Sequence, residues 1–365
     1  MLSDYLPWVI VSVVVLALVT GGLLYGRARG NPMSPLNLRR GRPGREHLRD
    51  PHAPRTPPKQ AAVIVNPTKI ADLPMVKERI ATSCHARGWG DPLFYETTVD
   101  DPGHGQARQA VRDGAKVVCS LGGDGTVRSV ASALVGTETP LGILPAGTGN
   151  LLARNLDMPV VDLDGAVAVA LAGRNRRIDV GELVVGTTDE DGAGETASHY
   201  FLVMGGIGMD AAIMAGTNEK MKKTVGWPAY LLSGIRHLVS PEFRATITLD
   251  ADPDFRRRAR SVVIGNCGKL VGGLVLMPNA KIDDQLLDVM IASPRGFFGW
   301  VPVFTRVATR RRKGHPILDH KVCEEVRVRT DRPLPVQIDG DAIGEFTQIV
   351  GIVRPTSLTV RVSQT

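Results

Sequence analysis

From Ala61 onward, short apolar runs alternate with stretches of helical spacing, and polar or glycine-rich loops follow the runs. Strands are predicted at AAVIV (61–65), DPLFYETT (91–98), KVVCSL (116–121) and TPLGILP (139–145). Such alternation indicates a parallel sheet with helices on its faces. Ligands of these sheets bind at the carboxyl ends of the strands. Three sharp loops are expected at that edge: NPT (66–68), GGDGT (122–126) and PAGTGN (145–150).

Beyond about residue 178 the pattern changes, because one apolar run follows another with few helical stretches between them. Two such stretches are predicted, near 230–238 and 297–311. We therefore expect an α/β domain over 61–178 and a mostly antiparallel, β-rich domain over 179–365.

The chain begins with an apolar segment. No charged side chain occurs from Tyr5 to Gly26, and about 20 apolar residues suffice for a helix to span a bilayer. We predict a single transmembrane anchor over 1–26, the alternative being a buried core helix. Basic residues follow it, so the positive-inside rule places the body on the cytoplasmic side of the cell membrane.

The segment 27–60 is rich in proline and arginine. It carries nine Lys or Arg against Glu46 and Asp50, which accounts for the whole formal net charge of +7. We expect a disordered linker that either is attracted to anionic lipid headgroups or merely solubilises the chain. Since the remainder is balanced and has no basic patch interleaved with aromatic residues, nucleic acid is not expected as a partner.

The GGDGT loop holds three glycines around one carboxylate. It lacks the GK[ST] ending of a Walker A loop and the spacing of a GxGxxG fingerprint. Taken alone, it is more typical of a structural turn than of a phosphate site. With the other two loops at the same sheet edge, and a helix N-terminus after GTGN, a nucleotide site is favoured.

NPT, GGDGT and LPAGTGN, in this order, resemble the catalytic domain of diacylglycerol kinases, above all the bacterial and sphingosine-kinase-like lipid kinases. The resemblance continues through GGIGMDA (205–211), KKTVGWPAY (222–230), PNAKIDDQLLDV (278–289) and VQIDGD (336–341). It covers about 61–365. It implies a two-domain fold that transfers the γ-phosphoryl group of ATP to a lipid hydroxyl.

The resemblance also implies site residues. Nucleotide would contact Asn66, Pro67, Thr68, Thr97, Gly122, Gly123, Asp124, Gly125, Thr126, Thr148 and Lys222, with Lys223 as the alternative cation. Asp124 is expected to organise the loop or a metal–water network, because a carboxylate repels phosphate. The family's late Asp-Gly-Glu motif, which supplies a general base, is Asp339-Gly340-Asp341 here. Asp339 is the predicted base, and Asp341 and Asp124 are the other predicted catalytic residues; for the DGD motif, the alternative is a plain β-turn.

In the related bacterial kinases, the loop matching KIDDQLL binds a structural Mg²⁺. By position, the ligands here would be the carboxylate of Asp284 and the carbonyls of Lys281 and Leu286; hard oxygen ligands suit Mg²⁺. The family usually has glycine where this chain has Gln285, and a solvated turn is the alternative.

The chain departs from the family after GGDGT, where Arg128-Ser129 replaces the usual Asn-Glu, and after GTGN, where leucines replace an aspartate. The favoured function is a membrane-anchored kinase that uses ATP and Mg²⁺ to convert diacylglycerol to phosphatidic acid. A kinase of sphingoid or other long-chain lipid alcohols, and a non-catalytic nucleotide- or lipid-binding homologue, are the alternatives. An NAD kinase is less favoured, and a homodimer remains open.

Overall fold

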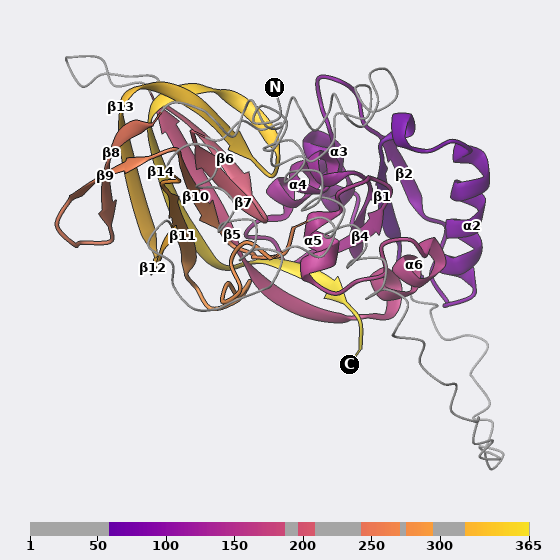
Figure 1. Ribbon diagram of the computed structural model, residues 1–365. Coiled ribbons are helices and arrows are strands. Elements are labelled where there is room, and N and C mark those ends of the chain that lie inside the picture. Colours follow the sequence, from indigo (N-terminus) through magenta and orange to yellow (C-terminus); the bar gives the residue numbers. More distant parts are fainter. Residues whose placement is uncertain (1–57, 187–195, 209–241, 271–274, 295–317, 365) are drawn as a thin grey trace, which may run out of the picture. The chain divides into compact units, whose positions relative to one another are not determined.

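The computed structural model describes residues 58–186, 196–208, 242–270, 275–294 and 318–364 (Figure 1). Several predicted features lie outside these residues: the anchor over 1–26, nearly all of the linker, the helices near 230–238 and 297–311, and Lys222 with Lys223. Within the described part, no helix is both long enough and apolar enough to cross a membrane.

The first domain is built on the predicted parallel sheet. Its strands run in the order β4-β3-β1-β2, and every neighbouring pair is parallel. Their bounds are β1 Ala61–Val65, β2 Leu93–Glu96, β3 Val117–Gly122 and β4 Leu141–Pro145. β1 and β3 are buried along their whole length, as strands covered on both faces must be.

Helices cover both faces of this sheet, as Figure 1 shows. Because side chains alternate along a strand, Val63 packs with α2 and α6, whereas Ile64 packs with α3 and α4. Helix α6 was not predicted from the sequence. The helices are η1 Pro67–Lys69, α2 Leu73–His85, α3 His104–Arg112, α4 Asp124–Leu134, α5 Leu151–Asn155 and α6 Leu163–Ala172.

The second domain is β-rich, and all strand pairs within its described part are antiparallel, as predicted. Its core contains Phe201, Phe243 and many aliphatic side chains. The strands are β5 Arg174–Gly186, β6 Thr196–Phe201, β7 Met204–Ile207, β8 Phe243–Leu249, β9 Phe255–Ala259, β10 Ser261–Gly265, β11 Leu287–Ala292, β12 Leu318–Cys323, β13 Glu325–Ile338 and β14 Asp341–Val362.

Two long strands, β5 and β14, join the domains. They pair antiparallel along most of their length, and near its end β14 also pairs in parallel with β4, Val360 opposite Leu141. The last residues of β14 therefore lie in the sheet of the first domain. The predicted boundary between 178 and 179 falls inside β5.

One buried carboxylate connects the paired strands β5 and β14 to the loop before β11. Asp179 has no exposed surface; its Oδ1 accepts the N–H of Thr356 on β14 and its Oδ2 the N–H of Gln285, both at 2.6 Å. Its own N–H donates to the carbonyl of Ile282 at 2.8 Å. A buried charge is tolerated because both oxygens have donors.

We predict that Asp179→Ala lowers the free energy of unfolding by about 3 kcal/mol, because it removes a buried carboxylate together with its hydrogen bonds to two partly buried backbone N–H groups. Urea denaturation measures this change. The control is Asp283→Ala, which removes only a partly exposed ion pair with Arg176 and is expected to cost less than about 1 kcal/mol. Similar losses for both variants would contradict the role of Asp179.

Candidate functional site

Four chain segments meet where the parallel strands of the first domain end. Asn66 follows β1, Thr97 follows β2, the 122–126 loop follows β3 and the 145–150 loop follows β4. The N–H of Thr97 donates to the carbonyl of Val65 at 2.8 Å, and the amide Nδ2 of Asn66 lies 3.4 Å from Oγ1 of Thr126. The predicted loops are thus brought together at one edge.

Asn66 shapes the first of these loops. Its Oδ1 accepts the N–H of Thr68 at 3.1 Å and the hydroxyl of Thr68 at 2.7 Å, which caps the short helix beginning at Pro67. Proline suits the first helical position because it has no N–H to leave unpaired. This cap holds the NPT residues beside the glycine loop.

Asp124 holds the second loop to the third. Its Oδ2 accepts the N–H of Asn150 at 2.8 Å, and its Oδ1 accepts the N–H of Leu151 at 2.6 Å. Burial raises the pKa of the Asp124 carboxyl, partly offset by these N–H donors. Both oxygens are occupied by the start of α5, so the carboxylate organises the loop.

The glycines let the backbones of these loops pass very close together. A Cβ added to Gly147 would lie 2.7 Å from Cα of Gly123, and one added to Gly122 would lie 2.6 Å from Oγ1 of Thr126. Asn150, at φ 48°, closes the third loop by exchanging two hydrogen bonds with Gly147. One tight turn would not need so many glycines.

The DGD motif is the tight turn between β13 and β14. Ile338 pairs with Asp341, and the residues between them, Asp339 and Gly340, have φ of 48° and 93°, as hairpin turns favour. Asp339 is nonetheless buried, and its carboxylate accepts the N–H groups of Leu202, Val203 and Met204 at 2.9–3.0 Å. Burial raises its pKa, opposed by Arg128 and these donors.

Arg128 connects this turn to the glycine loop. From α4, its Nη1 donates to the carbonyl of Ile338 at 2.7 Å and its Nη2 to Oδ2 of Asp341 at 2.8 Å. The Asp341 side chain is 58% exposed. A Cβ added to Gly125 would lie 3.3 Å from that carboxylate, so Asp341 lies directly over the 122–126 loop.

From the sequence, Arg128 is evident only as a departure from the family pattern. Its partner is 213 residues away in the sequence, so local pattern could not pair them. The available sign of its role was the presence of an arginine in the first turns of the helix that follows the glycine loop.

The predicted metal loop is folded around Gln285, whose φ is 65°. The N–H of Leu286 donates to Oδ1 of Asp284 at 3.3 Å. Burial, with the nearby charges of Asp288 and Asp179, raises the pKa of Asp284. This concentration of negative charge and hard oxygen donors fits a divalent cation. Among the described residues, no three His, Cys, Asp or Glu side chains cluster as metal ligands; the predicted set needs only one.

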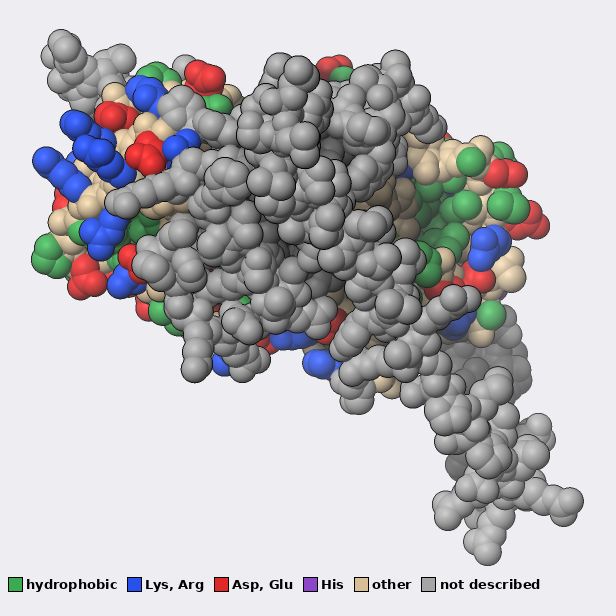
Figure 2. Space-filling model, viewed as in Figure 1, with side chains coloured by type: hydrophobic (Ala, Val, Ile, Leu, Met, Phe, Trp, Pro, Cys, Tyr) green, Lys and Arg blue, Asp and Glu red, His purple; other side chains and the backbone are tan. Residues whose placement is uncertain are grey.

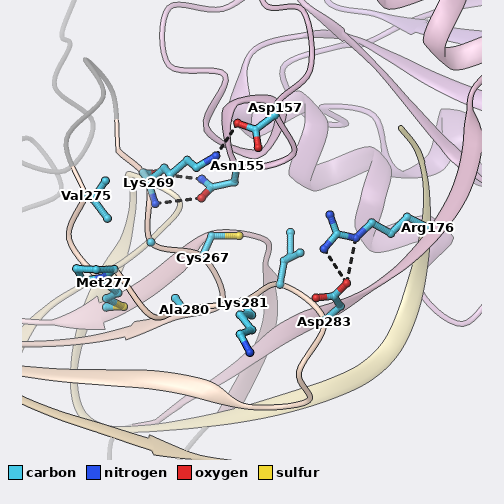
Figure 3. Close-up of a pocket in the computed structure, with 13 residues that line it drawn as sticks. Asn155, Asp157, Arg176, Cys267, Lys269, Val275, Met277, Ala280, Lys281 and Asp283 are labelled. Carbon is cyan, nitrogen blue, oxygen red and sulfur yellow. Dashed lines mark hydrogen bonds and ion pairs between the residues drawn. The ribbon is translucent and has the colours of Figure 1, made fainter. Parts of the chain in front are cut away.

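A cavity of about 570 Å³ lies beside this loop (Figure 3). On one side Asn155 exchanges two hydrogen bonds with the backbone of Lys269, each 3.0 Å long. On the other, Arg176 pairs with Asp283 at 2.6 Å. Lys281 also lines the cavity, whereas the 122–126 loop and the DGD turn do not.

Two family models match the chain. Residues 60–183 match the diacylglycerol kinase catalytic domain, and residues 204–362 match the YegS C-terminal NAD kinase beta sandwich-like domain. The catalytic-domain match includes NPT, GGDGT and GTGN. The DGD turn lies within the C-terminal match.

Curated relatives are similar to both parts. A protein of Pseudomonas aeruginosa named "Probable lipid kinase YegS-like" is 36% identical over 211 residues, which are 55% of this chain and 63% of the relative. The matched segment thus spans less than two thirds of that relative. A "Diacylglycerol kinase" of Staphylococcus saprophyticus is 25% identical over 295 residues, 79% of this chain and 90% of the relative.

A solved structure shares the fold. The crystal structure of a diacylglycerol kinase from Bacillus anthracis superimposes with a TM-score of 0.63 at 21% identity, covering 84% of this chain and 98% of that one.

We predict that Gln285→Gly raises the free energy of unfolding by about 1 kcal/mol, because glycine adopts positive φ without the steric cost that glutamine bears. Thermal denaturation with and without Mg²⁺ measures this. Gln285→Ala is the control, since alanine keeps a Cβ at the same φ and should not stabilise. Stabilisation by alanine as large as that by glycine would show that φ is not the cause.

Proposed function

The chain belongs to the diacylglycerol kinase family, and from that premise we propose that it transfers the γ-phosphoryl group of ATP to the hydroxyl of a membrane lipid. The favoured acceptor is diacylglycerol, which would give phosphatidic acid. A sphingoid or other long-chain lipid alcohol is the second candidate. The names of the relatives, a lipid kinase and a diacylglycerol kinase, support the acceptor class.

We place the ATP phosphates over the 122–126 loop. Side chains are absent at Gly123 and Gly125, so backbone N–H groups can approach phosphate oxygens closely. The N-terminus of α4, which begins at Asp124, favours negative charge. Asn66, Thr68, Thr97 and Thr148 would border the nucleotide, and Lys222 would supply a cation from outside the described residues. Such a site acts mainly by positioning and by neutralising charge.

We assign the general base to Asp341. A base must reach the acceptor proton and be free to accept it. The carboxylate of Asp339 is buried, with both oxygens occupied by backbone N–H groups. That of Asp341 is largely exposed, lies over the glycine loop and, among the described residues, forms an ion pair with Arg128 alone. Asp339 is then the residue that positions Asp341.

Arg128 has two roles in this proposal. It fixes one oxygen of Asp341, which leaves the other to face an acceptor hydroxyl. It also places a positive charge beside the loop where phosphate charge develops in the transition state, which lowers the barrier when the charge is held in place beforehand.

Mg²⁺ fits the loop that carries Asp284. The carboxylate of Asp284 and the carbonyls of Lys281 and Leu286 would hold it, and it would neutralise the charge that Asp179, Asp284 and Asp288 share. This role is structural. A nucleotide-bound Mg²⁺ would supply charge neutralisation at the phosphates.

Attachment to the membrane is part of the proposal. Residues 1–26 would anchor the chain, the basic linker would contact anionic headgroups, and the body would face the cytoplasm, where ATP is available. An anchor confines the enzyme to the surface that holds its substrate. Homodimerisation is compatible with this arrangement.

The observation that carries the proposal is the exposed carboxylate of Asp341 placed over the glycine loop. The test is incubation of the purified chain with γ-labelled ATP, Mg²⁺ and a panel of lipids. Label is expected in phosphatidic acid when diacylglycerol is supplied. Binding of ATP without labelling of any lipid alcohol would instead identify a non-catalytic homologue.

We predict that Asp341→Asn lowers kcat by at least about 100-fold, the usual size of a general-base contribution, while the KM for ATP and the melting temperature change little. Asp339→Asn is the matched variant. It places an amide group among three N–H donors, so it is expected to lower the melting temperature as well as kcat. The assignment would be wrong, and Asp339 would be the base, if the Asp339→Asn variant were fully folded but inactive while the Asp341→Asn variant remained active.

A further inference from the structure

A cluster of arginines lies on the sheet at the end of the second domain formed by β8, β9 and β13. Figure 2 shows Lys and Arg side chains gathered there. A shallow depression of about 390 Å³ is lined by five arginines and one acidic residue, Asp331. The arginines are Arg244, Arg256, Arg257, Arg258 and Arg329, which we call the arginine patch. All five are exposed.

Strand register places four of them on one face. Arg256 and Arg329 both pair with Thr246, from opposite sides, and Arg244 pairs with Arg258. Residues opposite each other, and residues two apart on a strand, point to the same face. The other face of β8 carries the buried residues Phe243, Ala245 and Ile247. The guanidinium groups thus project from a single open surface.

These charges are not neutralised by the described part of the chain. None of the five arginines forms an ion pair with a described acidic residue. Arg329 donates to the amide of Gln348, and Arg257 lies over the ring of Phe255, 5.3 Å from its centre. The patch therefore presents a concentrated positive potential to whatever approaches it.

Protection of a sheet edge explains only part of the patch. Among the described strands, β9 is paired with β8 alone, and charges on an edge strand discourage aggregation. However, Arg244 lies on β8 and Arg329 on β13, which have strands on both sides. Arg244 directly opposes Arg258, and like charges opposite each other destabilise a sheet. An anionic partner would remove that repulsion.

We propose that the arginine patch is a docking surface for anionic lipid headgroups of a bilayer. A broad, open sheet face with several guanidinium groups matches a planar array of phosphates, each of which an arginine can bind through two N–H groups. This inference rests on the proposed lipid-kinase function, whose substrate lies in a bilayer. The chain would then contact the bilayer through two basic regions, the linker and the arginine patch within the folded body.

The test places a fluorescent dye at the patch in the full-length chain. The four native cysteines are buried, so Thr246→Cys, between Arg256 and Arg329, can be labelled selectively. The protein is reconstituted with phosphatidylcholine vesicles that carry headgroup spin labels, with or without about 30 mol% phosphatidylglycerol. Quenching of the dye is expected only with phosphatidylglycerol, and about 1 M NaCl should abolish it through screening. No ATP is present, so the result is independent of kinase activity.

Matched variants separate the patch from total charge. The triple variant Arg244→Gln, Arg256→Gln and Arg258→Gln is expected to weaken the anionic-lipid-dependent contact about 100-fold, since each basic residue near an anionic surface contributes about fivefold. The control triple variant Arg87→Gln, Arg108→Gln and Arg112→Gln removes the same charge from exposed positions of the first domain and should retain quenching. Lysine at the three patch positions should largely restore it.

Three outcomes would overturn the proposal. The first is equal quenching with and without phosphatidylglycerol. The second is equal loss in both triple variants, because the patch would then have no special role. The third is displacement by millimolar inorganic phosphate, which would indicate a site for a small anion. Melting temperatures check that the patch variants fold. A dye at exposed Ala86 (Ala86→Cys) in the first domain provides the reference signal.

Discussion

The arrangement of the site depends on one buried carboxylate, that of Asp339, which accepts three successive N–H groups from residues 202–204. These donors lie at the junction of β6 and β7, and the acceptor lies in the turn between β13 and β14. These three hydrogen bonds therefore fix the turn on the second domain's sheet. Only with the turn so placed can Asp341 lie over Gly125 of the first domain.

Asp339 combines two energetically unfavourable features that its contacts must compensate. Asp339 places a carboxyl group in the interior and has a positive φ, and each is costly unless the surroundings compensate it. Three N–H donors and the guanidinium of Arg128 provide that compensation. Because Arg128 also binds the carbonyl of Ile338 and the carboxylate of Asp341, one side chain of the nucleotide-loop helix holds the turn in register with the loop.

Much of this could be predicted from the sequence, because the relevant signals are local. Strand–helix alternation and the glycine loops predicted a parallel sheet with its loops at one edge, and Asp124 was expected to organise its loop. What was missed depends on tertiary pairing. The partner of Arg128 is distant in sequence, and Asp179 looks like an ordinary strand residue. The net charge of each sequence segment does not reveal the arginine patch, because the patch forms only through the register of β8 with its neighbours.

The central claim is that ATP phosphates lie over the glycine loop and beside the carboxylate of Asp341. A crystal structure with Mg²⁺ and a non-hydrolysable ATP analogue tests it most directly. The account predicts that N–H groups of residues 123–126 contact the phosphates, with the γ-phosphate beside Asp341 and enough space between them for one hydroxyl. Phosphates bound elsewhere, for example in the cavity lined by Lys269 and Lys281, with the glycine loop unoccupied, would contradict it.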